Sequence, residues 1–284
     1  MVVVTGASGQ LGRLVIDALL KTLPAGEIVA AARKPDSVQD LAARGVQVRA
    51  ADYDRPETLD DALRGADKVL LVSGNEVGRR VPQHRAVIEA AKRAGVQLLA
   101  YTSVLRADTT PLSVGPDHKE TEALLQASGI PFVILRNGWY TENYLAGVAP
   151  ALQYGALMGG AGAGRIASAA RSDYAEAAAA VLTQDGKAGK IYELAGDDAY
   201  TLEQLAAELA RQSGKEVAYR DLPQAEYKAA LLGVGLPEDL AELISSSDAA
   251  AAHGALFDDG HQLSALIGRP TTTLAQSVKE ALQR

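Results

Sequence analysis

A glycine-rich turn at the start of the chain constrains its fold more strongly than any other feature. The stretch "VVVTGASGQLG" places the β-branched run 2–4 directly before Gly6, Gly9 and Gly12, and apolar residues at helical spacing follow. A buried strand, a glycine turn and a helix in this order are typical of the phosphate-binding turn that opens a βαβ unit. A plain connection between a strand and a helix is the alternative interpretation. If the turn is of the first kind, strands and helices should alternate after it.

The first half of the chain has this alternation. Short β-branched or apolar runs, typical of buried strands, occur at residues 2–4, 28–32, 47–51, 68–72, 96–102 and 132–136. Stretches with helical spacing lie between them, at residues 10–23, 36–44, 59–63, 81–94 and 118–128. Strands that alternate with helices form a parallel sheet covered on both faces, and right-handed crossovers make it doubly wound. The sequence therefore predicts an α/β fold with a doubly wound parallel sheet of the Rossmann type.

The pattern changes after Asn137. The stretch "GGAGAGR", residues 159–165, indicates a flexible loop that could act as a lid. A further strand, a helix that begins with a capping box at Thr201, a short strand in "EVAYRDL" and several helices follow. We therefore expect a dinucleotide-binding domain over residues 1–137. A smaller C-terminal α/β lobe, mainly on the substrate side, should cover residues 138–284, with some exchange of chain between the two.

Composition excludes several classes of function. The 284 residues suffice for one large core, or for a domain with a smaller partner. The absence of cysteine excludes disulfides and thiolate chemistry, and none of the four histidines has a partner at metal-ligand spacing, so we expect no metal site. The net charge of −7 argues against a nucleic-acid partner. No apolar run approaches the ~20 residues of a membrane span, and "MVVVTGASG" does not resemble a signal peptide, so we expect no membrane association and a cytoplasmic location.

The glycine turn and the end of the second expected strand together predict the coenzyme. Gly6 permits a tight turn, Gly9 lets the backbone approach a pyrophosphate, and Gly12 lets the helix pack closely on the sheet. The helix N-terminus then directs N–H groups and a positive dipole end at the anion. In "AARKP", Arg33 and Lys34 stand where an NAD site carries a carboxylate. Because a guanidinium binds a 2′-phosphate well, the sequence predicts NADP(H) rather than NAD(H), with an ordinary surface arginine as the alternative.

Two further segments follow expected strands at the edge where open α/β sheets bind ligands. Asp52 ends the third strand and could accept a hydrogen bond from the adenine amino group. A solvated turn carboxylate is the alternative for Asp52. Ser73, Gly74 and Asn75 follow the fourth strand, and we expect their backbone to line a ribose.

Seven stretches of the sequence together resemble a known family. They are "VTGASGQLG", "AARKP", "LLVSGNEVG", "LLAYTSVLRADTTPL", "LRNGWYTENYL", "GRIASAARSDYAEAAA" and "FDDGHQLSALIGRPTTTLAQSV". The chain resembles the NmrA-like branch of the atypical short-chain dehydrogenases, among its bacterial NADPH:quinone oxidoreductases and triphenylmethane reductases. The resemblance covers nearly the full chain. The glycine turn alone is unspecific, whereas "RNGWYTENY" after the sixth expected strand is much more specific.

The resemblance implies a two-lobed monomer with NADPH in the cleft between the lobes. It implies that residues 6–11 hold the phosphates, Arg33 the 2′-phosphate and residues 73–75 the ribose side. It also implies that residues 137–142 lie beside the nicotinamide and that Arg171 points toward the same cleft. The complete set of expected cofactor-binding residues is Gly6, Ala7, Ser8, Gly9, Gln10, Leu11, Gly12, Arg33, Asp52, Ser73, Gly74, Asn75, Asn137, Gly138, Trp139, Tyr140, Thr141, Glu142 and Arg171.

The stretch "YTSVL", residues 101–105, bears on the reaction. Many nucleotide-dependent reductases place a lysine four residues after a tyrosine near such a strand end, but here that position is Leu105. The family that the chain resembles also lacks this pair. Reduction of a ketone leaves an alkoxide-like oxygen that needs a positioned acid, whereas reduction of a quinone gives a phenolic oxygen with a pKa near ~10. The protein then needs only to hold NADPH and a flat acceptor together, and we expect Thr102, Asn137 and Tyr140 to do this positioning.

Several residues near the expected site have two interpretations. Tyr101 is expected to be a core residue whose hydroxyl group bonds to the backbone. His118 and Lys119 could donate a proton or bind the acceptor, or they could form a solvated helix start. Trp139 could form an aromatic wall for a flat ring, or it could be an ordinary core anchor.

The sequence thus predicts NADPH-dependent two-electron reduction of quinones, with a small-molecule quinone as the partner and a monomer or dimer as the assembly. A redox sensor that binds the dinucleotide without turnover is the alternative, because the missing Tyr–Lys pair fits a sensor equally well. Reduction of another flat acceptor, such as a cationic dye or an enone, is a third interpretation.

Overall fold

The computed structural model describes residues 1–76 and 78–283, and the chain forms two compact units. Unit 1 comprises Met1–Asp108, Pro116–Asn137 and Arg171–Glu193, whereas unit 2 comprises Thr109–Gly115, Gly138–Ala170 and Leu194–Arg284. The chain leaves unit 1 after Asn137, where the sequence pattern changes. Segments 109–115 and 171–193 depart from the expected ranges of 1–137 and 138–284, because each returns to the other unit.

Unit 1 is built on a seven-stranded sheet. Its strands are β1 (Val2–Val4), β2 (Ile28–Ala32), β3 (Gln47–Ala50), β4 (Lys68–Leu71), β5 (Leu98–Val104), β6 (Phe132–Asn137) and β8 (Lys190–Leu194). Their spatial order is β3-β2-β1-β4-β5-β6-β8, and each neighbouring pair from β3 to β6 is parallel. The order switches direction between β1 and β4. The loops after these two strands therefore flank the crevice where open α/β sheets bind ligands.

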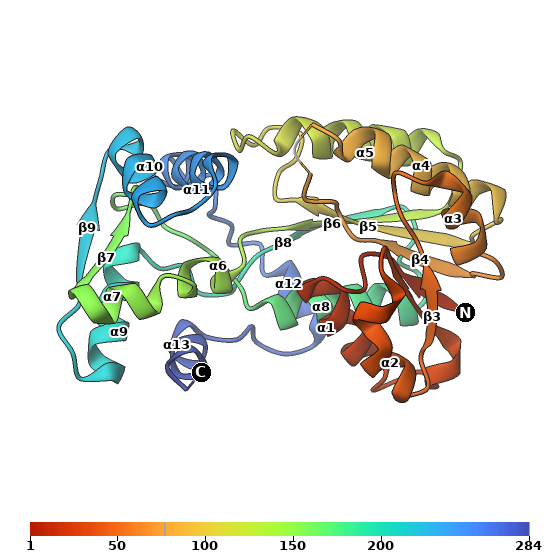
Figure 1. Cartoon of the computed structure of the whole chain (residues 1–284), viewed down its shortest axis with the longest axis horizontal. Coiled ribbons are helices and arrows are strands. Elements are labelled where there is room, and N and C mark those ends of the chain that lie inside the picture. The colour runs from red at the N-terminus through yellow and green to blue at the C-terminus, as the bar shows by residue number, and fades with distance from the viewer. Residues whose placement is uncertain (77, 284) are drawn as a thin grey trace. The chain divides into compact units, whose positions relative to one another are not determined.

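Helices cover both faces of this sheet. They are α1 (Gln10–Leu19), η1 (Ala25–Glu27), η2 (Pro35–Val38), α2 (Gln39–Ala43), α3 (Pro56–Ala62), α4 (Arg80–Arg93), α5 (Gly115–Ala127) and α8 (Arg171–Thr183). Figure 1 shows α3, α4 and α5 over one face and α1, α2 and α8 over the other. This arrangement confirms the predicted doubly wound α/β fold. Helix α8, which packs against α1, was not predicted, because its alanine-rich sequence carries no distinct apolar stripe.

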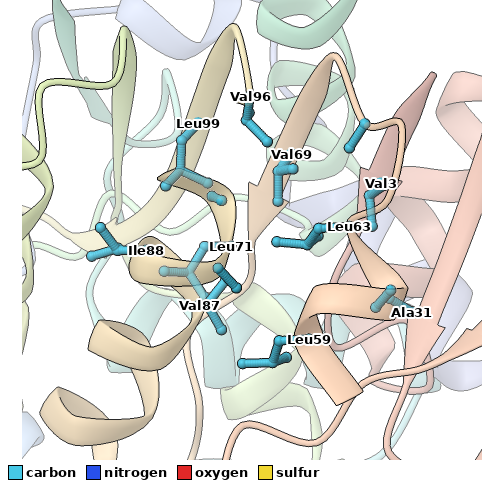
Figure 2. Close-up of a cluster of buried hydrophobic side chains, with 14 of the residues drawn as sticks. Val3, Ala31, Leu59, Leu63, Val69, Leu71, Val87, Ile88, Val96 and Leu99 are labelled. Atoms are coloured by element: carbon cyan, nitrogen blue, oxygen red, sulfur yellow. The ribbon is translucent and has the colours of Figure 1, made fainter. Parts of the chain in front are cut away.

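One hydrophobic cluster of unit 1 fills the space between the sheet and the helices α3 and α4. Figure 2 shows side chains of the sheet, among them Val69 and Leu99, facing Leu63 at the end of α3 and Ile88 of α4. These four side chains are almost completely buried. Burial of each aliphatic side chain of this size stabilises a fold by about 1.5–3 kcal/mol. The loops at the carboxyl edge are therefore attached to a firmly packed base.

Unit 2 contains a small parallel sheet of two strands, β7 (Ala156–Gly159) and β9 (Ala218–Asp221). Its helices are α6 (Thr141–Leu145), α7 (Val148–Tyr154), α9 (Leu202–Ser213), α10 (Gln224–Gly233), α11 (Glu238–Ala251), α12 (Gln262–Ile267) and α13 (Leu274–Leu282). The capping box predicted at Thr201 is confirmed, since Thr201 and Gln204 each bond the other's backbone N–H. Across the described part of the chain, none of the helices has the length and apolar character to span a bilayer.

Residues 159–165, expected to form a flexible loop or a lid, make close contacts with α11. The N–H of Gly160 donates to Oδ2 of Asp248 at 2.9 Å, which ties the segment to α11. A Cβ atom on Gly164 would lie 2.3 Å from the carbonyl oxygen of Ala251, at the end of the same helix. The glycine at this position therefore permits close packing against α11, and a lid role for the segment stays a prediction.

Candidate functional site

The turn between β1 and α1 has the geometry of a phosphate-binding loop. Gly6 has a φ of +59°, in the left-handed region that favours glycine. A Cβ atom on Gly12 would lie 2.4 Å from the carbonyl oxygen of Gly6 and 2.9 Å from Cα of Ala7, so this approach of α1 requires glycine. The N–H of Ala7 donates to the carbonyl of Ala31 in β2 at 3.1 Å, which joins the turn to the sheet.

The N-terminus of α1 is open to an anion. Ser8, Gly9 and Gln10 are exposed, and among the described residues no side chain caps this helix and no acidic side chain lies in its first turn. Arg171, the first residue of α8, donates a hydrogen bond to the side-chain oxygen of Gln10 and so brings a cation to the turn. Free N–H groups, the positive end of the helix dipole and a guanidinium fit the pyrophosphate of a dinucleotide.

The two residues expected at the adenosine end lie after β2 and β3. Arg33 is largely exposed, and its Nη1 lies 3.0 Å from Oε1 of Glu76. Oδ1 of Asp52 accepts a hydrogen bond from the N–H of Asp54 at 3.1 Å, so the carboxylate stabilises the turn that follows β3. Contacts of Arg33 with a 2′-phosphate and of Asp52 with adenine stay predictions.

Side chains from β5 and α4 hold the backbone of the loop that follows β4. Oγ1 of Thr102 accepts the N–H of Ser73 at 2.9 Å. His84 accepts the N–H of Gly74 on its Nε2 at 2.9 Å, while Nε of Arg80 donates to the carbonyl of Gly74 at 2.6 Å. Thr102 is buried, so the structure places this residue beneath the loop that we expect to line a ribose.

His84 has one defined proton arrangement in this network. Because its Nε2 accepts the N–H of Gly74, its proton must lie on Nδ1, which is 3.0 Å from Oγ1 of Thr121. The hydroxyl of Thr121 donates in turn to the carbonyl of Asp117 at 2.8 Å. Burial, supported by the charge of Arg80, lowers the pKa of His84 to about 3. His84 is therefore neutral near pH 7 and serves as an acceptor for the loop.

Tyr101 is fully buried in β5, as expected, but the expected bond of its hydroxyl to the backbone is wrong. The partner is Nδ1 of His118, at 2.6 Å. His118 is itself buried, and burial is the main cause that lowers its pKa to about 3. This argues against a cationic proton donor near pH 7, and the solvated helix start is also wrong for His118. Lys119 is exposed, and its Nζ donates to the carbonyl of Asp108 at 3.3 Å.

Acid should destabilise the protein through His84 and His118. Their pKa values of about 3 in the folded chain lie below the ordinary value of 6.5, so between these limits the unfolded chain binds protons that the folded chain does not. The free energy of unfolding should therefore fall as the pH drops from about 6.5 toward about 3, by ~1.4 kcal/mol per pH unit for each histidine. His84→Gln keeps an acceptor for the loop and should remove one such contribution.

Urea denaturation of the parent and of His84→Gln over this pH range measures the difference in slope. His253→Gln, at an exposed position, is the matched control for the loss of an imidazole and should retain the slope of the parent. Identical slopes for the parent and His84→Gln would contradict the assignment of a buried neutral imidazole.

The expected nicotinamide-side residues from Gly138 to Glu142 lie in unit 2. The hydroxyl groups of Thr141 and Ser168 are 2.8 Å apart, and Thr141 is buried. The rings of Trp139 and Tyr144 lie with centroids 6.4 Å apart at an interplanar angle of 48°. Both side chains are half-buried, so Trp139 belongs to an aromatic pair rather than to a fully buried core. Its contact with a flat acceptor stays a prediction.

The structure thus places the candidate residues in two groups. The glycine turn, Arg171, the loop after β4 and Thr102 lie in unit 1, and Asn137 is the buried last residue of β6 in the same unit. Gly138, Trp139, Tyr140, Thr141 and Glu142 belong to unit 2.

Sequence reasoning missed the supporting residues of α4. The first turn of this helix buries Arg80, Gln83 and His84, at the spacing that later buries Val87 and Ile88. Polar side chains at the start of an otherwise apolar helix face are a sequence signal that could have identified them. Sequence reasoning also missed Tyr144, whose hydroxyl donates to the buried Asp248 at 2.9 Å.

Comparisons with known proteins agree with this geometry. The sequence model of an NAD(P)H-binding family matches residues 6–185. Quinone oxidoreductase 2 of Escherichia coli is 57% identical over 98% of this chain and 97% of its own length. The crystal structure of that NADPH-dependent enzyme complexed with NADPH has a TM-score of 0.97, covering 99% of this chain and 100% of the other.

Two further relatives extend the comparison. The triphenylmethane reductase of Citrobacter sp., in a crystal structure complexed with NADP(H), is 37% identical with a TM-score of 0.96 and covers 99% of this chain and 100% of its own. An NmrA-like family domain-containing oxidoreductase of Aspergillus flavus is 29% identical over 79% of this chain and 75% of its own length.

Proposed function

The chain belongs to the NAD(P)H-binding family of oxidoreductases, and from this premise we propose that it reduces quinones with NADPH by two-electron hydride transfer. The observation that carries the proposal is 57% identity, over nearly the full length, to a quinone oxidoreductase. The open phosphate turn of unit 1 supports the coenzyme part of the proposal. The absence of a lysine four residues after Tyr101 supports the acceptor part, since Leu105 occupies that position.

The residues of the chain bind and orient rather than transfer protons. The turn at residues 6–12 holds the pyrophosphate by its N–H groups, and Arg171 adds a positive charge beside it. The loop at residues 73–75 lines a ribose, with His84 and Thr102 holding its backbone in place. NADPH supplies the hydride when bound.

Reduction of a quinone requires no proton donor from the protein in addition to this binding. The product oxygen is phenolic, with an ordinary pKa near ~10, and its charge spreads over the ring, so water can supply the proton. A flat acceptor requires a flat surface, and we assign this surface to Trp139, supported by the ring of Tyr144. Asn137 and Tyr140 are proposed to position the nicotinamide and the acceptor.

Another flat acceptor is the second candidate, favoured by the 37% identity to a triphenylmethane reductase. Purified protein mixed with NADPH and a soluble quinone should consume NADPH, measured by its absorbance, and should do so faster than with a triphenylmethane dye. Faster turnover with the dye would favour the second candidate. Binding of NADPH without turnover of any acceptor would favour a redox sensor and would contradict the proposed reaction.

A further inference from the structure

A network of charged side chains surrounds Arg33 at the carboxyl edge of unit 1. One carboxylate, that of Glu76 in the loop after β4, bridges two guanidinium groups. Its Oε1 lies 3.0 Å from Nη1 of Arg33, and its Oε2 lies 3.4 Å from Nη1 of Arg79. Nε2 of Gln83 donates to the same Oε2 at 3.1 Å. Arg79 also binds Oδ1 of Asp54 with its Nη2 at 2.8 Å.

The Glu76 carboxylate holds a position that suits a phosphate group. Its two oxygens each accept from a different arginine, as two oxygens of a phosphate monoester would. Such a phosphate carries about −1.5 to −2 charges near pH 7, against −1 for the carboxylate, so it competes well for the same guanidinium groups. Glu76 and Arg33 are solvent-accessible, with side-chain exposures of 34% and 62%, and the exchange therefore costs little desolvation.

We propose that Arg33 and Arg79 form a two-arginine clamp for the 2′-phosphate of NADPH, and that Glu76 occupies this clamp until the phosphate displaces it. The proposal rests on the proposed function for the location of the coenzyme, and it goes beyond that function by assigning Arg79 and Glu76. Asp54 and Gln83 hold Arg79 and Glu76 at the clamp by hydrogen bonds.

Two consequences follow for the choice of coenzyme. The 2′-phosphate of NADPH can form contacts with the two arginines in place of those that Glu76 loses. NADH lacks the group that would displace the carboxylate. Glu76 thus lowers the affinity for NADPH, because the phosphate must displace it, while Arg79 raises the affinity for NADPH alone. A general electrostatic attraction would give effects of the same signs, but it would act on the pyrophosphate of NADH as well. Restriction of both effects to ligands with a 2′-phosphate therefore distinguishes the clamp.

Isothermal titration calorimetry with NADPH, NADH and adenosine 2′,5′-bisphosphate tests the clamp without any acceptor present. Arg79→Ala should raise the dissociation constants of NADPH and of the bisphosphate about tenfold, the effect of losing one charge-assisted hydrogen bond, and should leave that of NADH unchanged. Glu76→Gln should lower the dissociation constants of the two phosphate-bearing ligands about threefold to tenfold, again without an effect on NADH.

The exposed pair of Arg93 and Asp60 provides matched controls in the same unit. Nη2 of Arg93, the last residue of α4, lies 2.7 Å from Oδ1 of Asp60 in α3, whereas the clamp residue Arg79 directly precedes the first residue of α4. Arg93→Ala and Asp60→Asn change the net charge by the same amounts as the two test variants and should leave all three dissociation constants unchanged.

Two results would overturn the proposal. Equal effects of Arg79→Ala on NADPH and NADH, or no effect on either, would remove Arg79 from the 2′-phosphate. Weaker NADPH binding by Glu76→Gln would mean that Glu76 organises Arg33 rather than competing with the ligand. A parent protein that binds NADPH but reduces no quinone would refute the proposed reaction while leaving the clamp intact, so the two failures are distinguishable.

Discussion

Gly12→Ala should weaken the binding of NADPH by roughly a hundredfold, although it adds a single carbon atom. That atom would lie 2.4 Å from the carbonyl oxygen of Gly6 and 2.9 Å from Cα of Ala7. Both neighbours are backbone atoms of the phosphate turn, so α1 must move away from the turn or the turn must open. Either change displaces the N–H groups to which we assign the pyrophosphate.

Calorimetry with NADPH measures this loss, and the melting temperature of the same variant reports any accompanying destabilisation. Gly233→Ala is the matched control, because a Cβ atom at Gly233, the last residue of α10, meets no other atom within 4 Å. Gly9→Ala should have an intermediate effect, since its Cβ atom would lie 3.2 Å from the carbonyl oxygen of Gly6. An unchanged affinity of Gly12→Ala for NADPH would refute the assignment of the turn.

Arg136→Met should destabilise the fold by about 3–5 kcal/mol, because it leaves a buried carboxylate without its cation. Nη2 and Nε of Arg136 lie 2.7 and 3.0 Å from the two oxygens of Glu122, whose side chain is almost fully buried. Nη1 of Arg136 also binds Glu193 at 2.7 Å and Asp108 at 3.0 Å. The hydrogen bonds with Glu122 are the main cause that raises the pKa of Arg136.

The free energy of unfolding from chemical denaturation measures this effect. Arg211→Ala, which breaks an exposed ion pair with Glu208 on α9, should cost less than ~1 kcal/mol and controls for the loss of an arginine. Replacing Glu122 with leucine in the Arg136→Met background should recover much of the loss, because no buried charge then remains unpaired. A double variant less stable than Arg136→Met would contradict this account.

Much of unit 1 could be predicted because its strands are separate apolar runs between turn residues. The strand β2 covers Ile28–Ala32, as the sequence predicts, and all five of its residues are buried. The family and the geometry of the glycine turn could also be predicted, since the glycine spacing depends on backbone geometry alone. The strand β7 could not, because its four residues carry no distinct pattern and pair only with the distant β9 among the described strands.

The hydrogen-bond partners in the polar network behind the loop after β4 could not be predicted for a different reason, although the spacing of its α4 residues could have indicated that they are buried. Whether a histidine is solvated or buried depends on its tertiary neighbours, and those of His84 are Gly74 and Thr121, contributed by separate elements. The same holds for His118, whose partner Tyr101 lies in the middle of a strand. The contacts of residues 159–165 with α11 could not be predicted either, because glycine in a sequence is compatible with close packing as well as with mobility.

The route of the chain between its two units limits how such a protein can diversify. The backbone passes from one unit to the other five times, after residues 108, 115, 137, 170 and 193. Neither unit is encoded by one continuous stretch of the sequence, so joining a foreign lobe end to end onto residues 1–137 would omit α8 and β8. New acceptor preferences in this lineage should therefore arise by point substitutions and loop insertions within the existing framework, and not by recombination of whole modules.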